Sequence, residues 1–251
     1  MSTSEIDRVI PTWRTHPCVP CRDSSRHAPG AGKSAGAART TACATNLLKW
    51  SLIFLLAAAA FGADGPRLFY SRSFPGSVPA YLEVRLEKNG DAQYREALDD
   101  DQPLTFHLED AGTSAVFDLA AKLDYFKHPL ESPLKVAFMG TKTFRYENGD
   151  QKSQVQFNYS EDPNAHALMD WFERMAESAE HRIDLERAAK YDHLGVFKAV
   201  VLLQSAMERK RLVALDQFLP MLDRIAKNET YMHTARERAA EIAEAIRSPK
   251  P

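Results

Sequence analysis

Two Asn-Gly-Asp triplets, at residues 89–91 and 148–150, constrain the fold of this chain more than any other feature. Asn-Gly between alternating apolar and polar residues is the strongest short signal for a β-hairpin, because both residues tolerate the positive φ of a tight turn. Segments with strand-like alternation flank the two turns, at residues 81–88, 91–97, 142–147 and 150–159. We therefore expect two antiparallel hairpins.

Each hairpin precedes a segment with helical periodicity, so a hairpin–helix unit occurs twice. After the first hairpin, apolar residues recur at helical spacing over 116–126, and Thr113 or Ser114 is the expected N-cap. After the second hairpin, Asp162 is the expected cap and Pro163 the first helical residue. Further strands are expected at residues 67–73, 104–108 and 135–139.

The C-terminal region, residues 163–251, is almost entirely compatible with helix. Four segments carry apolar residues at intervals of three and four, at 163–190, 192–210, 214–228 and 230–247. No linker rich in Gly, Ser or Pro separates them from the β-rich region 64–162, so a separate helical domain and a core shared with the sheet both stay open. The expected fold class is α+β: an antiparallel sheet from two hairpin–helix units, followed by a C-terminal helical bundle.

Residues 47–63 have the pattern of an export signal. Lys49 provides a short basic front, residues 52–61 form an uncharged apolar run, and small residues follow up to Ala63. The run is shorter than the ~20 residues that a membrane-spanning helix needs. We therefore expect a secreted or periplasmic protein that begins near Ala63 or Asp64 and keeps no stable membrane span after the signal is removed.

Residues 1–46 precede this signal and lack apolar periodicity, so we expect them to be disordered. One interpretation is a translation start at or near Leu47, with residues 1–46 joined by a wrong start assignment. The alternative is a genuine leader followed by an internal signal anchor. Cys18 and Cys21 lack a second cysteine pair, and Gly30 to Ser34 lacks the first glycine of a phosphate-binding loop.

Composition excludes several function classes. All three cysteines precede residue 47, so the region after the signal has no thiol nucleophile and no cysteine metal ligand. Basic and acidic residues nearly balance, 32 against 34, and no basic cluster stands out, which argues against a nucleic-acid partner. No catalytic motif and no cofactor-binding motif is recognisable, so we expect no cofactor.

Three groups of polar residues are candidate sites. Glu229, His233 and Glu237 are spaced by four and, on one helix face, would offer carboxylate, imidazole and carboxylate to a metal; a solvated face with local ion pairs is the alternative. His166 with Asp170 forms a similar pair. The run Asp99–Asp101 lacks the alternating ligands of a calcium loop, and a solvated turn is expected there.

The segment Phe74-Pro75-Gly76-Ser-Val-Pro-Ala-Tyr81 is a candidate binding loop, because it combines two aromatic residues with a glycine and two prolines. The alternative is a structural turn that packs Phe74 and Tyr81 against the sheet. This loop, the following Leu-Glu-Val-Arg-Leu, the turn at Asn89-Gly90 and Tyr94 together resemble uncharacterised secreted bacterial domains over residues 68–127. The resemblance implies a small α+β domain with no assigned activity, and it transfers no catalytic residue.

These observations favour a non-catalytic, exported module that binds a protein or another component of the cell envelope. One alternative is a hydrolase whose acid and base groups are acidic residues and histidines from distant segments. Another is a structural protein that oligomerises through its helices. The enzyme should have a deep pocket with titratable residues, whereas the binding module should have an exposed apolar patch or an aromatic-bearing open sheet face.

The export prediction can be checked by intact mass. Protein collected from the exported fraction should have a mass that corresponds to a chain beginning near Ala63 or Asp64. Exported protein that retains residues 1–46 would contradict both the signal assignment and the proposed start.

Overall fold

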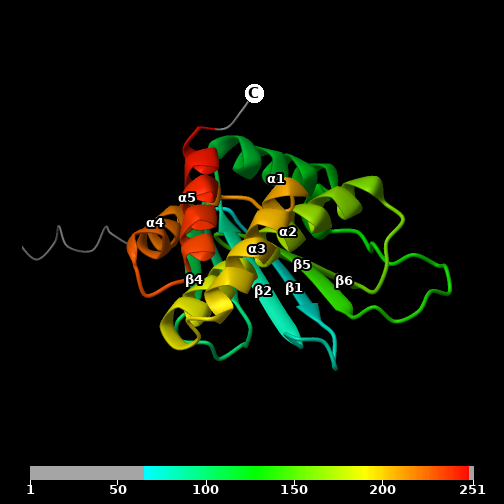
Figure 1. Cartoon of the computed structure of the whole chain (residues 1–251). Coiled ribbons are helices and arrows are strands. Elements are labelled where there is room, and N and C mark those ends of the chain that lie inside the picture. The colour runs from blue at the N-terminus through cyan, green and yellow to red at the C-terminus, as the bar shows by residue number, and fades with distance from the viewer. Residues whose placement is uncertain (1–64, 249–251) are drawn as a thin grey trace, which may run out of the picture. The chain divides into compact units, whose positions relative to one another are not determined.

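The computed structural model of this protein describes residues 65–248, in which a single six-stranded antiparallel sheet carries helices on one face (Figure 1). The strand order is β4-β3-β2-β1-β5-β6. The strands are β1 Arg67–Ser73, β2 Tyr81–Glu87, β3 Asp91–Arg95, β4 Leu104–His107, β5 Thr141–Asn148 and β6 Gln151–Phe157. The two predicted hairpins are β2–β3 and β5–β6, and they lie on opposite sides of β1.

Strand β1 pairs along its whole length with β2 on one edge and with β5 on the other. Alternation places Leu68 and Tyr70 on the face that the helices cover, and both are fully buried. Phe144 on β5 lies opposite Tyr70 in the register. The predicted strands at 67–73 and 104–108 are confirmed as β1 and β4.

Within residues 65–248, five α-helices and two short 3-10 helices accompany the sheet, which confirms the predicted α+β class. They are α1 Asp110–Lys122, η1 Asp124–Phe126, α2 Pro163–Tyr191, α3 Gly195–Glu208, η2 Leu215–Phe218, α4 Leu219–Lys227 and α5 His233–Arg247. The Asp162 carboxylate caps α2, as predicted, by accepting the backbone N–H of Asn164 at 2.7 Å. No helix within residues 65–248 is both long and apolar enough to cross a membrane.

Two local predictions are wrong. Residues 135–139 form no strand, because the backbone of this segment bonds a side chain instead: Asn158 accepts the N–H of Met139 at 2.7 Å and donates to the carbonyl of Ala137 at 3.1 Å. Helix α1 begins at Asp110, so Thr113 lies inside it; its hydroxyl donates to the carbonyl of Leu108 at 3.3 Å instead of capping.

The long helix α2 crosses the strands and belongs to both hydrophobic clusters of the protein (Figure 1). Leu168, Phe172 and Met175 pack with the sheet and α1, whereas Leu185 packs with α3, α4 and α5. The sheet cluster centres on stacked or tilted aromatic rings with centroids about 5–6 Å apart, from Tyr70, Phe126, Phe144, Phe157 and Phe172. The predicted boundary between residues 162 and 163 therefore falls at the start of a helix that contributes to both clusters.

The two glycine turns differ in geometry. The β5–β6 loop contains only Gly149 and Asp150, with Gly149 at φ 56°, as in the first position of a type II′ turn. The β2–β3 loop has three residues and ends in Gly90 at φ 92°. A Cβ atom at residue 90 would lie 2.5 Å from the carbonyl oxygen of Leu108, whereas one at residue 149 would meet nothing within 4 Å.

This contrast predicts unequal costs for the same substitution. Gly149→Ala should lower the free energy of unfolding by about 1–2 kcal/mol, because alanine is strained at positive φ. Gly90→Ala should cost about 1–3 kcal/mol more, because the new methyl group also clashes with the backbone at Leu108. Chemical denaturation of both variants measures the difference, and equal costs would show that the contact relaxes freely.

Candidate functional site

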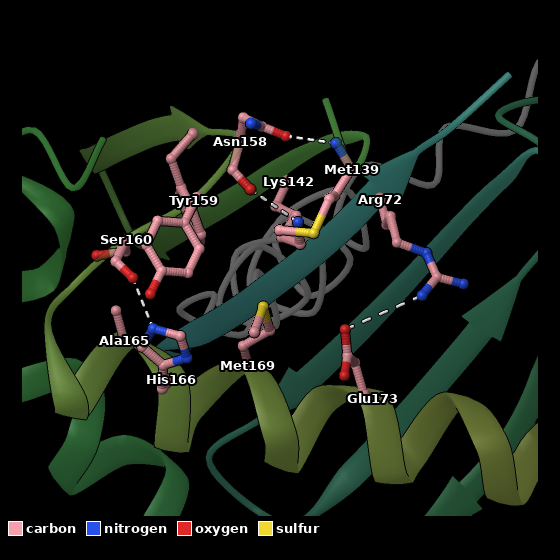
Figure 2. Close-up of a pocket in the computed structure, with 11 residues that line it drawn as sticks. Arg72, Met139, Lys142, Asn158, Tyr159, Ser160, Ala165, His166, Met169 and Glu173 are labelled. Atoms are coloured by element: carbon pink, nitrogen blue, oxygen red, sulfur yellow. Dashed lines mark hydrogen bonds and ion pairs between the residues drawn. The ribbon is translucent and has the colours of Figure 1, made fainter. Parts of the chain in front are cut away.

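A cavity of about 290 Å³ lies where the end of β1, the start of β5 and the end of β6 meet the first turns of α2 (Figure 2). Its lining combines apolar side chains with a few charged ones: Arg72, Met139, Lys142, Phe157, Asn158, Tyr159, Ser160, Ala165, His166, Met169 and Glu173. A small apolar hollow with a few converging polar groups is the usual form of a ligand site.

The strand register brings two cations together in this cavity. Arg72 on β1 lies directly opposite Lys142 on β5, and both follow the alternation of the helix-covered face. Like charges at directly opposed positions destabilise a sheet. The covered face is otherwise apolar here, with Leu68 and Tyr70 on β1 and Phe144 on β5. The Arg72–Lys142 pair interrupts this apolar pattern on both strands.

Lys142 is a nearly buried cation, with an exposed fraction of 7%. Its Nζ donates a hydrogen bond to the backbone carbonyl of Asn158 at 2.8 Å. Among residues 65–248, no carboxylate lies within ion-pair distance of this nitrogen. Burial lowers the pKa of the Lys142 ammonium, with opposing contributions from Glu173 and Glu131 and a reinforcing one from Arg72.

Glu173 on α2 contributes a negative charge to the cavity wall. Its Oε1 lies 3.9 Å from a guanidinium nitrogen of Arg72 and accepts a hydrogen bond from the hydroxyl of Tyr70 at 3.4 Å. Burial raises the pKa of Tyr70, and the neighbouring Glu173 charge raises it further, so the phenol stays a neutral donor. Glu173 is thus held between a core tyrosine and the exposed end of β1.

His166 forms the opposite end of the cavity (Figure 2). Its Nε2 lies 2.6 Å from the carbonyl oxygen of Ser160, and its ring meets that of Tyr159 edge-on at 5.6 Å. The His166–Asp170 pair considered from the sequence does not form, because Asp170 accepts from Arg211 at 2.6 Å. The Ser160 carbonyl therefore fixes the His166 imidazole, with no help from Asp170.

The rim of the cavity carries exposed apolar side chains from two loops. Phe138 is 58% exposed and Met139, which also lines the cavity, is 46% exposed. The Phe138 ring meets that of Phe74 edge-on, with centroids 6.1 Å apart. The part of the candidate binding loop that precedes β2, residues 74–80, thus lies beside the segment 134–140.

The candidate binding-loop residues do not share one surface. Phe74, Pro75 and Gly76 are exposed in the loop after β1, where the Phe74 ring contacts Phe138. Tyr81 lies on the opposite, helix-free face, where its hydroxyl donates to Glu83 at 2.9 Å. Burial, reinforced by the Glu83 charge, raises the pKa of Tyr81 to about 12.

The helix-free face of the sheet is covered largely by ion pairs. Arg95 bonds Glu83 and Arg85 bonds Glu87, each at 2.5 Å. The guanidinium of Arg145 covers the ring of Phe69 at 3.9 Å from its centroid, so Phe69 is only 9% exposed. This face is therefore mostly polar, and its central aromatic ring is not open to a partner.

The metal-ligand candidates do not form a cluster. Glu229 lies in the turn before α5, so it does not share the helix face on which His233 bonds Glu237 at 3.0 Å. No group of three or more potential ligands for a metal occurs within residues 65–248. Asp99–Asp101 form a turn in which Asp100 accepts the N–H of Gln102 at 2.9 Å, as expected for a solvated turn.

Sequence reasoning missed the cavity residues Arg72 and Lys142. A signal was present: each cation occupies a position where alternation with its neighbours calls for a buried apolar side chain. The strand partners could not be identified from the sequence, because β1 and β5 are separated by 67 intervening residues that include both β2–β3 and α1.

No family model matches the chain, and no curated protein matches it. The resemblance of residues 68–127 to uncharacterised secreted bacterial domains stays a hypothesis.

A second tyrosine–glutamate contact on α2 gives a pH-dependent prediction. The hydroxyl of Tyr94 lies 3.3 Å from Glu180 and 3.2 Å from Glu96. Burial raises the pKa of Glu180, and the hydrogen bond from Tyr94 only partly opposes this effect. Folding therefore favours the protonated form of Glu180. Its contribution to the free energy of unfolding is complete below pH 4.5, the ordinary pKa of the group, and is lost as the pH rises through the raised pKa of the folded state.

Glu180→Gln should therefore raise the melting temperature at pH 7 but not at pH 4, where the native side chain is already largely neutral. The matched control is Glu241→Gln on the exposed face of α5, which should change neither value. Thermal melts at the two pH values make the comparison, and a glutamine variant less stable than the native protein at pH 7 would contradict it.

Proposed function

We propose that this chain is a non-catalytic, exported binding module of the cell envelope, which contacts a protein or another envelope component. The observation that carries the proposal is the contact between the exposed rings of Phe74 and Phe138, which joins loops 74–80 and 134–140 next to Met139, a residue of the cavity lining. We call the exposed apolar side chains of these two loops the apolar rim; they are Phe74, Val78, Leu134, Val136, Phe138 and Met139.

Exposure on this scale favours a binding role. Val78 is fully exposed and Phe138 is 58% exposed, although both belong to short loops anchored to the sheet. Soluble proteins rarely gather large apolar side chains on one surface unless that surface meets a partner. On the helix-free face of the sheet, by contrast, Arg145 covers the central ring of Phe69, so that face offers no open aromatic surface to a partner.

The compartment is part of the proposal. The export signal expected at residues 47–63, together with residues 1–46, lies outside the described residues. An exported module would meet membrane, cell-wall or envelope-protein surfaces, for which an apolar rim beside a cationic cavity is suited.

The hydrolase alternative would use His166 and Glu173, the histidine and the carboxylate among the described lining residues. However, Nε2 of His166 is engaged by the Ser160 carbonyl, and Glu173 is engaged by Arg72 and Tyr70. The alternative of oligomerisation through the helices has support of its own. Tyr191 and Leu194 are exposed where α2 meets α3, in a segment distant in sequence from loops 74–80 and 134–140.

Variants of the rim test the proposal against this alternative. The double variant Val78→Ser, Phe138→Ser should reduce binding to an isolated envelope fraction at least about tenfold, because central apolar contacts dominate most interfaces. The matched control is the double variant Tyr191→Ser, Leu194→Ser, which removes similar exposed apolar area elsewhere. Cosedimentation over a range of envelope concentrations gives the apparent affinity.

Equal binding of the rim variant and the native protein to the envelope fraction would overturn the proposal. If only the α2–α3 variant lost binding, or if that variant alone changed from oligomer to monomer in size-exclusion chromatography, the helical corner would be the interface instead.

A further inference from the structure

We propose that the cavity binds a small amphipathic carboxylate, with its anionic group beside Lys142 and Arg72 and its apolar tail among Met139, Phe157 and Met169. This inference rests on the proposed binding function and gives it a ligand class. It is carried by a buried lysine that pairs with no carboxylate within residues 65–248 and that the sheet register places opposite a second cation.

The lining of the cavity carries more cations than carboxylates. Lys142 and Arg72 both line it, and Glu173 is the one carboxylate among its described lining residues. Glu173 pairs with Arg72, and the nearby Glu131 accepts the backbone N–H of Asn158 at 2.5 Å. Buried charges are normally paired, since desolvation of an isolated ion is costly. Lys142 is thus left with donor capacity for an added anion.

The position of the ammonium suits a ligand that enters from the rim. Figure 2 shows the Lys142 nitrogen beside the Asn158 carbonyl, in the middle of the lining, with Tyr159 and His166 at one end and Arg72 and Glu173 at the other. An ammonium has three N–H donors, and the Asn158 carbonyl accepts only one of them. A carboxylate oxygen could accept another.

The remaining lining suits an apolar tail of limited length. Met139, Phe157, Ala165 and Met169 present thioether, aromatic and methyl groups to the cavity. Methionine side chains adapt to ligands of different shape, because they are unbranched and polarisable. A volume of about 290 Å³ holds roughly ten groups the size of a water molecule or a methylene, at ~30 Å³ each. A medium-chain fatty acid such as decanoate has this size.

The charged groups around Lys142 fit an anionic ligand. Burial opposes the charge of the ammonium and Arg72 on β1 opposes it further, whereas Glu173 on α2 and Glu131 on the preceding loop favour it. An anion beside the nitrogen would offset the cost of burial. The competing interpretation is structural, in which Lys142 serves only to hold the Asn158 carbonyl at the end of β6.

Calorimetric titration of the exported protein with decanoate at pH 7 tests the proposal. Decanoate should bind at least about tenfold more tightly than decanol, which has the same tail without the charge. Lys142→Met keeps an unbranched chain as long as the lysine stem but removes the ammonium, and it should weaken decanoate binding at least about tenfold. Lys152→Met on β6, where the native side chain is 68% exposed, is the matched control and should leave binding unchanged.

Thermal melts of the same variants separate the two roles of Lys142. If the lysine is a ligand-binding group, Lys142→Met should fold with an unchanged or higher melting temperature, because it removes a buried charge. A second variant, Met169→Trp, keeps both cations but fills the cavity, and it should also lose decanoate binding. Equal binding of decanoate and decanol, or decanoate binding that survives both substitutions, would overturn the proposal.

The outcome is distinguishable from a failure of the proposed function. The rim variant Val78→Ser, Phe138→Ser retains Lys142 and Arg72, so it should still bind decanoate even where envelope binding is lost. Decanoate binding without any envelope binding would leave the ligand inference standing and overturn the binding-module proposal. If the native protein binds the envelope but not decanoate, and Lys142→Met leaves envelope binding intact, the ligand inference is overturned and the binding-module proposal stands.

Discussion

The pairing of β1 on both of its edges is the constraint on which the rest of this structure depends. Its seven residues match β2 and β5 without a break, and side chains on a strand alternate between faces. A slip of one residue would expose Leu68 and Tyr70 and bury the opposite set. The register that places Tyr70 in the aromatic core therefore also carries Arg72 to the cavity and opposes it to Lys142.

Helix α2 connects the sheet and the cavity to the C-terminal helices. It supplies Phe172 to the core and Glu173 to the cavity from adjacent positions. Farther along, its buried Ser178 hydroxyl accepts the N–H of Val213 at 2.9 Å, and Arg211 bridges two of its carboxylates. These contacts secure the chain between α3 and α4 to the helix that covers the sheet. The cavity wall is consequently part of the same rigid element that organises the C-terminal helices.

The two faces of the sheet differ in how their charged side chains are paired. On the helix-free face, Arg85 and Arg95 each meet a glutamate, so the charges are balanced where solvent is available. On the covered face, Lys142 is nearly buried with a carbonyl as its hydrogen-bond partner. Departures from local consistency of this kind tend to occur at functional sites. The cavity with its buried lysine is such a departure, and the exposed ring of Phe138 follows in sequence directly before Met139 of its lining.

The sequence by itself determined most of the secondary elements, because periodicity and turn chemistry are local. Both glycine turns, the Asp162 cap and the α+β class could be predicted, whereas the predicted strand at 135–139 failed because the distant side chain of Asn158 bonds its backbone. Only the tertiary structure decided the site. Arg72, Lys142 and Glu173 lie on three elements far apart in the chain, and strand register and helix packing, which depend on long-range contacts, bring them together.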